Sequence, residues 1–269
     1  MAAQVLTITS GKGGVGKTTT TANIGVALAL RGKRVVCLDA DIGLRNLDVV
    51  LGLENRIVYD IVDAIEGRCK LRQALIKDKR LPDLYLLPAS QKRYKSAVKP
   101  EDLVRVCGEL GAEHDFILID SAAGIEEGFR TALAPAHNVV IVTNPEVSAV
   151  RDADRVIGLV EAAEKGPPKL IVNRLKPELV QRGDMLDTKD VLEILAVDLL
   201  GIIPEDETIL ISTNRGHPAA LEERSKAGQS FRNIASRLLG EDVPFETFRE
   251  APGLLRRLGR LFGSDGRSG

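Results

Sequence analysis

The chain has 269 residues, of which 44% are hydrophobic, and its formal net charge is −1. This length and composition allow a full hydrophobic core, and the balanced charge argues against a general electrostatic attraction to nucleic acid. The three cysteines are widely separated, which argues against a disulfide framework or a cysteine-based zinc site and suits a reducing compartment. The sequence shows neither a targeting segment nor an apolar run of about 18 residues, so we expect a cytoplasmic protein.

Short β-branched runs alternate with helical periods along the chain. Apolar runs predict strands at residues 4–10, 34–39, 84–88, 116–120, 138–143, 169–173 and 199–204. Helical periodicity is present at residues 18–31, 60–66, 101–112, 127–134, 148–164, 188–196 and 226–239. Most of the strands are apolar throughout, as in strands that are buried on both faces of a parallel sheet. The alternation predicts a single doubly wound α/β domain over residues 1–240, with a mostly parallel sheet and helices on both faces.

The segment GKGGVGKT follows the first predicted strand and opens the first predicted helix. It matches the phosphate-binding pattern G-x-x-x-x-G-K-[ST] in the strand–loop–helix setting that the pattern requires. Its glycines let backbone N–H groups converge on phosphate oxygens, and Lys17 is expected to reach the β- and γ-phosphates, while Thr18 offers its hydroxyl to Mg²⁺. The predicted nucleotide-binding residues of this loop are Gly11, Lys12, Gly13, Gly14, Val15, Gly16, Lys17, Thr18 and Thr19.

Two acidic segments follow predicted strands, at the sheet edge where ligands bind in open α/β folds. Asp39 and Asp41 lie at the end of the second strand, and Asp120 ends the strand at 116–120. We expect Asp120 to hold Mg²⁺ through a water molecule, and Asp39 and Asp41 to flank the same ion. Hydrolysis also needs a group that orients the attacking water, and neither acidic segment contains a glutamine for this task.

The additional lysine at position 12 gives the loop the form K-G-G-x-G-K-T, and in this feature the chain resembles the deviant Walker A ATPases. Segments such as GLRNLDVVLGLE and TNPEVSAVRDADR extend the resemblance over residues 4–262, to the septum-positioning branch of that family. The resemblance implies ATP and Mg²⁺ as cofactors, a slow and partner-stimulated ATPase, and an ATP-dependent homodimer. One departure is Ala122, where the family usually carries proline.

The same resemblance assigns roles to individual residues. It implies that Lys12 reaches the phosphates of the second subunit and that Asp41 orients the attacking water. Together with Lys17 these are the expected catalytic residues. Asn173 and the segment that follows Pro204 occupy the positions that contact adenine in the family.

The segment LLRRLGRLF, residues 254–262, separates into two faces when it is read as a helix. Its apolar face contains Leu254, Leu255, Leu258, Leu261 and Phe262, and its basic face contains Arg256, Arg257 and Arg260. The pattern predicts a tail, residues 253–269, that binds an anionic membrane when an ATP-bound dimer joins two copies, with residues 241–252 as its linker. The alternative is that this helix packs on its own domain or forms a dimer seam.

The resemblance also implies protein partners. We expect a division-inhibitor protein, brought to the inner face of the cell membrane, and an activator of hydrolysis or a polar scaffold, but no nucleic acid. Two related functions remain alternatives: chromosome or plasmid partition, and control of flagellar number. Partition needs a basic surface, which the runs KDKR and QKRYK together with Arg232 and Arg237 could supply, although 38 acidic residues dilute them. An iron–sulfur electron carrier is excluded, because residues 113–135 contain no cysteine.

Overall fold

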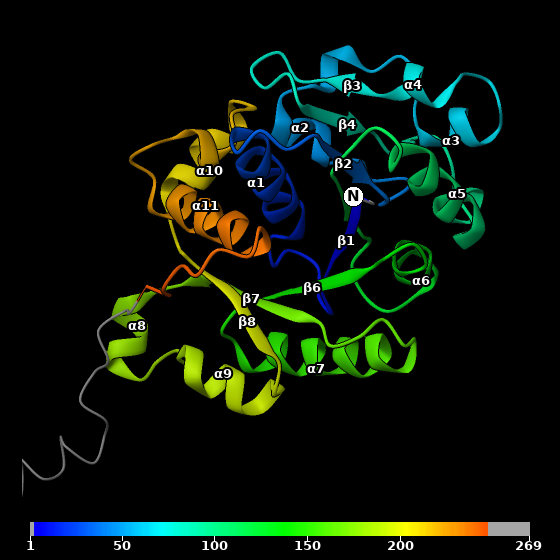
Figure 1. The fold of residues 1–269 in the computed structure, drawn as a ribbon. Coiled ribbons are helices and arrows are strands. Elements are labelled where there is room, and N and C mark those ends of the chain that lie inside the picture. Colours follow the sequence, from blue (N-terminus) through cyan, green and yellow to red (C-terminus); the bar gives the residue numbers. More distant parts are fainter. Residues whose placement is uncertain (1–2, 247–269) are drawn as a thin grey trace, which may run out of the picture.

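The computed structural model describes residues 3–246, apart from the side chain of Lys95. These residues form an eight-stranded sheet in the order β3-β4-β2-β5-β1-β6-β7-β8 (Figure 1). All neighbouring strands are parallel except β3 and β4, which are antiparallel. The strands are β1 Gln4–Thr9, β2 Val35–Asp39, β3 Ile76–Lys77, β4 Leu84–Leu87, β5 Phe116–Asp120, β6 Asn138–Thr143, β7 Lys169–Leu175 and β8 Asp198–Pro204.

Helices cover both faces of the sheet, as the alternating sequence pattern predicts. Helices α1, α2, α10 and α11 lie on one side, and α5, α6, α7 and α9 lie on the other (Figure 1). The helices are α1 Lys17–Leu30, α2 Leu47–Leu51, α3 Ile61–Ile65, α4 Leu71–Ala74, α5 Pro100–Leu110, α6 Glu127–Leu133, α7 Val147–Ala162, α8 Pro177–Arg182, α9 Thr188–Leu195, α10 Glu207–Asn214 and α11 Lys226–Leu238. Short 3₁₀ turns span Glu54–Arg56, Lys95–Ala97 and Ala219–Leu221.

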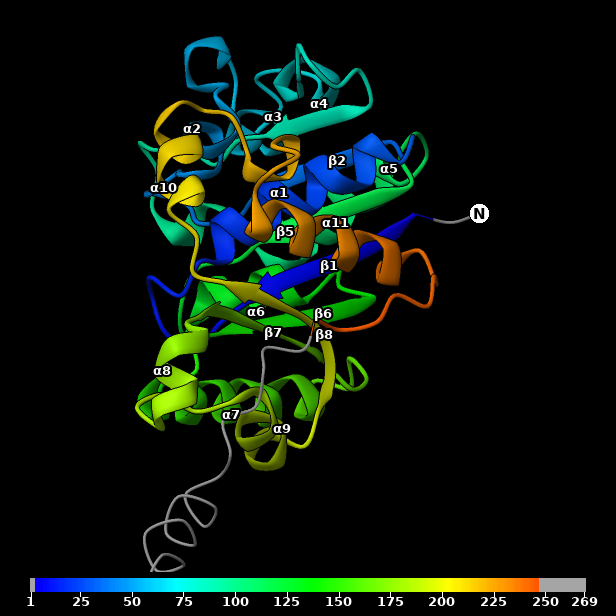
Figure 2. The same cartoon turned by 90° about the vertical axis from the view of Figure 1, so that its left-hand side faces the viewer.

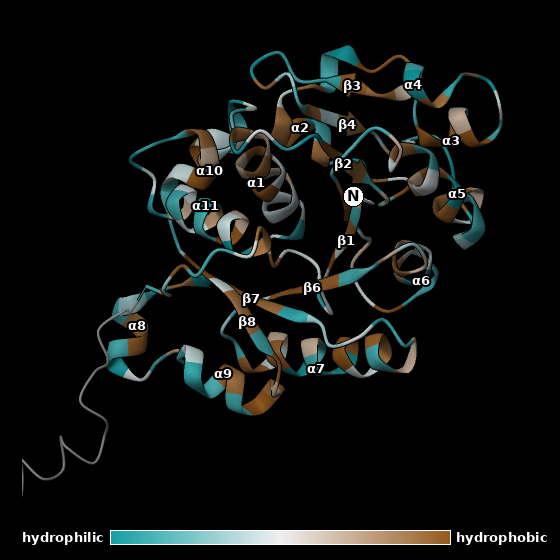
Figure 3. Cartoon of the chain, in the orientation of Figure 1, coloured by the Kyte–Doolittle hydropathy of each residue, from teal (hydrophilic) through white to brown (hydrophobic). Residues whose placement is uncertain are grey.

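The apolar strands are explained by a core on each face of the sheet. In β5, Phe116 and Leu118 belong to the cluster under α1 and α11, whereas Ile117 and Ile119 belong to the cluster under α5. Successive side chains of a strand point to opposite faces, so a strand that is covered twice is apolar at every position. Each outer helix packs on the sheet with one face and exposes the other to solvent. Hydrophobic and hydrophilic colours therefore alternate along α7 and α9 (Figure 3).

Within residues 3–246, all seven predicted strands and the seven helices predicted there are present, with ends that differ by at most two residues. The structure adds β3 and four helices that the sequence did not predict, namely α2, α4, α8 and α10. These helices are four to eight residues long, as are the predicted helices α3, α6 and α9, so length alone does not explain the difference. Helices α8 and α10 bury at most one residue each, so no apolar stripe marks them in the sequence. The prediction of a doubly wound, mostly parallel sheet is confirmed.

Residues 241–245, the start of the predicted linker, lie against the domain. Arg237 in α11 donates to the carbonyl oxygens of Leu200 (3.0 Å), Val243 (3.0 Å) and Pro244 (2.9 Å), and its guanidinium stacks 4.1 Å from the Phe245 ring. The contacts of the folded domain therefore continue to Phe245. The predicted tail at 253–269 falls outside the described residues. Within residues 3–246, none of the helices combines the length and apolarity that crossing a bilayer requires.

Candidate nucleotide site

The loop between β1 and α1 has the backbone shape of a phosphate cradle. Gly14 and Gly16 adopt φ angles of +79° and +97°, in the left-handed region that favours glycine. A Cβ atom at Gly16 would lie 2.3 Å from the side-chain Nδ2 of Asn173, so a larger residue would displace this side chain from its hydrogen bond to Val15. The loop lies at the carboxyl edge of the sheet, toward which the arrowhead of β1 points in Figure 2. The predicted residues 11–19 thus form one continuous loop and the first turn of α1.

The two lysines of the loop lie in different environments. Lys17 begins α1 and is 7% exposed, beneath the loop. Lys12 is exposed, and its ammonium group lies 3.4 Å from the hydroxyl of Ser148 in the first turn of α7. A Cβ atom at Gly11 would lie 2.2 Å from the carbonyl oxygen of Asp152, so the loop packs tightly on α7. One lysine is thus buried at the start of α1, where its charge acts on Asp120, and the other lies on the surface beside the loop.

The two acidic strand ends lie side by side. Asp39 and Asp120 are register partners on β2 and β5, and their exposed fractions are 1% and 2%. Burial raises the pKa of both carboxyl groups above its ordinary value. The charge of Asp120 raises the pKa of Asp39 further, while the charge of Lys17 opposes the rise at Asp120. A cation at this place would therefore be favoured by two buried acids.

The residues around Asp120 fit a magnesium ion. The hydroxyls of Thr18 and Thr21 hydrogen-bond to its carboxylate, the latter at 3.5 Å. A threonine hydroxyl and one carboxylate beside a phosphate loop are typical donors for Mg²⁺, which takes its remaining ligands from phosphates and water. Across residues 3–246 we find no group of three or more His, Cys, Asp and Glu side chains that could hold a metal, so phosphate oxygens would have to complete the coordination.

Asp39 has a structural task that the sequence does not reveal. One of its carboxylate oxygens accepts the amide of Asp41 (3.0 Å), and the other accepts the amides of Asn46 (3.1 Å) and Leu47 (3.2 Å). These bonds fold residues 40–46 around the Asp39 side chain and fix the position of the partly exposed Asp41. Asp39 therefore organises the loop that carries Asp41. Contact of Asp39 with the metal stays a prediction.

Asn173 and Pro204 meet at the same edge of the sheet. The Nδ2 of Asn173 donates to the carbonyl oxygen of Val15 (2.7 Å), and its buried Oδ1 has no hydrogen-bond partner among the described residues 3–246. Pro204 is the register partner of Leu175, and the amide of Glu205 donates to the Leu175 carbonyl (2.9 Å). A buried acceptor without a partner costs about 1–3 kcal/mol, so a ligand amino group would be favoured beside the phosphate loop.

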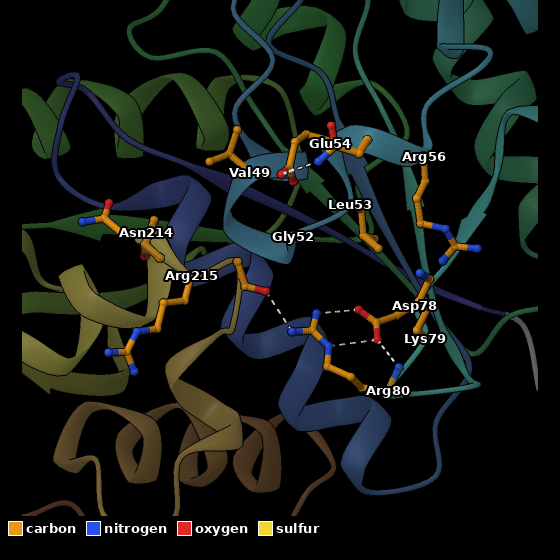
Figure 4. A pocket seen from close by; sticks show the side chains of 13 residues that line it. Val49, Gly52, Leu53, Glu54, Arg56, Asp78, Lys79, Arg80, Asn214 and Arg215 are labelled. Carbon is orange, nitrogen blue, oxygen red and sulfur yellow. Dashed lines mark hydrogen bonds and ion pairs between the residues drawn. The ribbon is translucent and has the colours of Figure 1, made fainter.

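Among residues 3–246, a cavity of about 350 Å³ lies between α4 and α5, and two larger cavities also lie outside the phosphate loop. One of about 510 Å³ lies between α2, the β3–β4 hairpin and the end of α10, and the ion pair of Arg80 and Asp78 lines it (Figure 4). The other, of about 410 Å³, lies between the start of α7, α8 and α9. None of the three has the glycine-rich backbone of a phosphate site, and the candidate nucleotide site therefore remains the loop before α1.

Comparison with known proteins shows a nucleotide-binding domain. Residues 6–219 match the domain family described as the CobQ/CobB/MinD/ParA nucleotide binding domain. The chain is 56% identical over 259 residues to the septum site-determining protein MinD of Synechocystis sp., covering 96% of this chain and 97% of that protein. The chain belongs to the MinD family.

Solved MinD structures share the fold. MinD from the MinC:MinD cell division complex of Aquifex aeolicus superposes with a TM-score of 0.86, at 52% identity over 91% of this chain and 99% of that chain. MinD of Pyrococcus horikoshii in complex with Mg-ADP superposes with a TM-score of 0.78. Its sequence is 32% identical, and the match covers 88% of this chain and 96% of that chain. The chain is thus a septum site-determining protein of the MinD family with a nucleotide-binding ATPase fold. The related functions in partition and flagellar number are not favoured.

Proposed function

We propose that this protein hydrolyses ATP, forms a homodimer when ATP is bound, and brings a division inhibitor of the MinC type to the inner face of the cell membrane. The observation that carries the proposal is the separation of the two loop lysines. Lys17 is buried beneath the phosphate cradle, and Lys12 is exposed at its rim. A single nucleotide needs the first lysine, whereas the second is available to a second subunit.

The residues of the site have separate roles in hydrolysis. Backbone N–H groups of residues 11–16 surround the phosphates, and Lys17 neutralises negative charge at the terminal phosphate. Thr18 and Asp120 would hold the metal, the first through its hydroxyl and the second through its carboxylate. When bound, Mg²⁺ would offset the charge on the phosphate oxygens. Asp41, positioned by Asp39, orients the attacking water, which attacks the terminal phosphorus as ADP departs.

Dimerisation follows from the position of Lys12. Two triphosphates that face each other across an interface repel, and this repulsion grows as water is removed. Lys12 from each subunit would lie between them and form charge-assisted hydrogen bonds with the partner's phosphates. The dimer would therefore be stable with ATP and separate after hydrolysis.

Release depends on a partner. The acidic segments contain no glutamine that would orient water and no arginine assigned to the transition state, so the basal rate is expected to be slow. We propose that an activator of the MinE type, or a polar scaffold, sets the time of hydrolysis. MinD of Aquifex aeolicus is solved in a complex with MinC, which supports an inhibitor of that type as the second partner.

The proposal is tested by light scattering of the purified chain with Mg-ATP. Lys12→Ala should bind ATP yet remain monomeric, because the two triphosphates lose their compensating charge. Asp41→Ala should dimerise and stay dimeric, because it cannot orient water. Lys169→Ala removes an exposed lysine at the opposite edge of the sheet and should behave as the wild type. A Lys12→Ala dimer of unchanged affinity would overturn the assigned role.

A further inference from the structure

The cavity of about 510 Å³ in Figure 4, which we name the basic cavity, is lined by more cations than acids. Three segments form its walls: α2 with the 3₁₀ turn that follows it, the turn of the β3–β4 hairpin, and the residues that end α10. Its cationic side chains are Arg56, Lys79, Arg80 and Arg215, and its acidic side chains are Glu54 and Asp78.

Only part of this positive charge is neutralised. Asp78 is 3% exposed and pairs with Arg80 at 2.7 Å, so these two charges compensate each other. Among the described residues 3–246, no acid forms an ion pair with the other three cations, and Glu54 is the one remaining acid of the lining. In Figure 4, Arg215 and Arg56 lie on opposite sides of the view, with Arg80 between them. The basic cavity therefore has charge to offer an anion.

The walls of the basic cavity are fastened to one another. Arg80 donates to the carbonyl oxygens of Leu51 (2.7 Å) and Gly216 (2.8 Å), which joins α2 to the end of α10. A Cβ atom at Gly52 would lie 2.5 Å from the carbonyl oxygen of Gly216, so the two backbones are in close contact. Because the cavity is formed before a ligand arrives, binding would cost little ordering entropy.

The remaining lining residues and the size of the cavity indicate a small organic ligand. The apolar side chains of Val49 and Leu53 and the amides of Asn55 and Asn214 lie among the charged residues. A volume of about 510 Å³ falls in the range of roughly 300–1,000 Å³ that is typical of small-molecule sites. Guanidinium groups bind phosphate through paired hydrogen bonds, and an ammonium group adds a point charge.

We propose that the basic cavity binds a small organic anion that carries phosphate groups, held by Arg56, Lys79 and Arg215. A soluble phosphate ester and the headgroup of an anionic lipid share this chemistry. Binding would rely on side-chain cations, in contrast to the backbone cradle of the nucleotide site. The proposal also gives a role to the basic run KDKR, of which the last three residues line the cavity.

The basic cavity borders two segments that continue from the nucleotide site. Helix α2 follows residues 40–46, which Asp39 holds in place, and α10 follows Pro204. A ligand that contacts both helices would favour one arrangement of these segments and so change the rate of hydrolysis. This consequence rests on the proposed function, whereas the binding itself does not.

The test is a titration of the isotope-labelled full chain with fructose 1,6-bisphosphate, followed by NMR at constant ionic strength and free Mg²⁺. Excess Mg-ADP fills the phosphate loop, so that the probe cannot bind there. Amide signals of residues 213–216 should shift in a saturable way, and fructose, which lacks the phosphates, should leave them unchanged. Lys79→Gln, in the hairpin rather than in α10, should weaken binding about tenfold, because a hydrogen bond between charged groups is lost.

Lys92→Gln is the matched control, because Lys92 is also exposed but does not line the cavity. It should bind the probe with wild-type affinity. The proposal would be overturned if the signals of residues 213–216 did not shift, if fructose shifted them equally, or if Lys79→Gln combined with Arg215→Gln left the affinity unchanged.

A parallel titration with dihexanoyl phosphatidylglycerol, below the concentration at which it forms micelles, identifies the source of the phosphate. Tighter binding than that of fructose 1,6-bisphosphate would assign the basic cavity to a lipid headgroup, and weaker binding would assign it to a soluble phosphate ester. Because Mg-ADP allows neither hydrolysis nor the proposed ATP-dependent dimer, failure of the proposed function would leave this result unaffected.

Discussion

Asn173 uses the two atoms of its amide for different purposes. Its nitrogen is committed to the Val15 carbonyl in the phosphate loop, and its buried oxygen has no partner within residues 3–246. The hydrogen bond to Val15 also fixes which atom of the amide is the oxygen. A donor on the ligand would satisfy that oxygen, and the amino group of adenine is a donor that guanine lacks at the equivalent position. A single side chain would thus connect base selection to the geometry of the loop.

This connection predicts a loss of selectivity in Asn173→Ala. The wild type should bind Mg-ATP about tenfold more tightly than purine riboside triphosphate, which lacks the amino group, because one buried hydrogen bond contributes roughly 1–1.5 kcal/mol. The variant should bind both nucleotides equally and less tightly. Titration calorimetry with each nucleotide measures the two affinities. A preference for ATP that persists in Asn173→Ala would rule out this base contact.

Elements far apart in the sequence are joined by Arg80. From the turn after β3, its guanidinium donates to the carbonyl oxygens of Leu51 (2.7 Å) at the end of α2 and Gly216 (2.8 Å) after α10, and it pairs with Asp78 (2.7 Å; Figure 4). Burial raises the pKa of Asp78, but hydrogen bonds from Arg80 and neighbouring amides outweigh it, so the pKa lies below its ordinary value. The short helices α2 and α10 are held in place by this network.

Arg80→Ala should therefore destabilise the domain by about 2–4 kcal/mol, because it leaves the buried carboxylate of Asp78 without its charged partner. Arg34→Ala is the control, since Arg34 and Asp115 form an exposed pair at 3.3 Å that should contribute less than about 1 kcal/mol. Urea unfolding of both variants, followed by circular dichroism, measures the difference. Equal unfolding midpoints for the two variants would show that the network contributes little.

For the whole molecule, membrane binding depends on two tails acting together. One short amphipathic helix gains apolar burial and about 1 kcal/mol for each arginine at an anionic surface, but ordering its backbone costs about 1–2 kcal/mol per residue. A single tail should therefore bind weakly. Joining two tails in one dimer can raise the affinity by roughly 10²–10⁴-fold without any new contact. ATP would thus control membrane binding by changing the number of linked tails.

Leu258→Glu should abolish ATP-dependent sedimentation with anionic vesicles while ATP-dependent dimerisation persists. The carboxylate would have to enter the acyl region, where the wild-type leucine is favourable. Leu258→Met keeps the apolar face and serves as the control. Co-sedimentation with ATP and with ADP, combined with light scattering of the same samples, separates the two properties. Vesicle binding by the Leu258→Glu dimer at wild-type affinity would contradict the predicted role of the tail.

The phosphate loop and the acidic strand ends could be predicted because the residues that define each of them lie close together in the sequence. A strand, eight residues of loop pattern and a helix define where Lys17 and Thr18 lie, and a strand end defines Asp120. The task of Asp39 could not be predicted, because an acceptor of three amides looks in sequence like any acidic residue at a strand end. Helix α10 was missed for a related reason, since its position depends on contacts with α2, more than 150 residues away.

The fastening of residues 241–245 to α11 has a mechanical consequence. A membrane-bound tail would pull on the chain at Phe245, and the load would pass through the three carbonyl bonds of Arg237 into the edge strand β8 and helix α11 together. Because the tether beyond residue 246 is at most about 28 Å to the start of the predicted helix, the ATPase domain would be held close to the bilayer and restricted in its tilt. The hydrogen bonds of the Arg237 guanidinium would thus carry a lateral force on the membrane-bound tail and keep it from unwinding the last turn of α11.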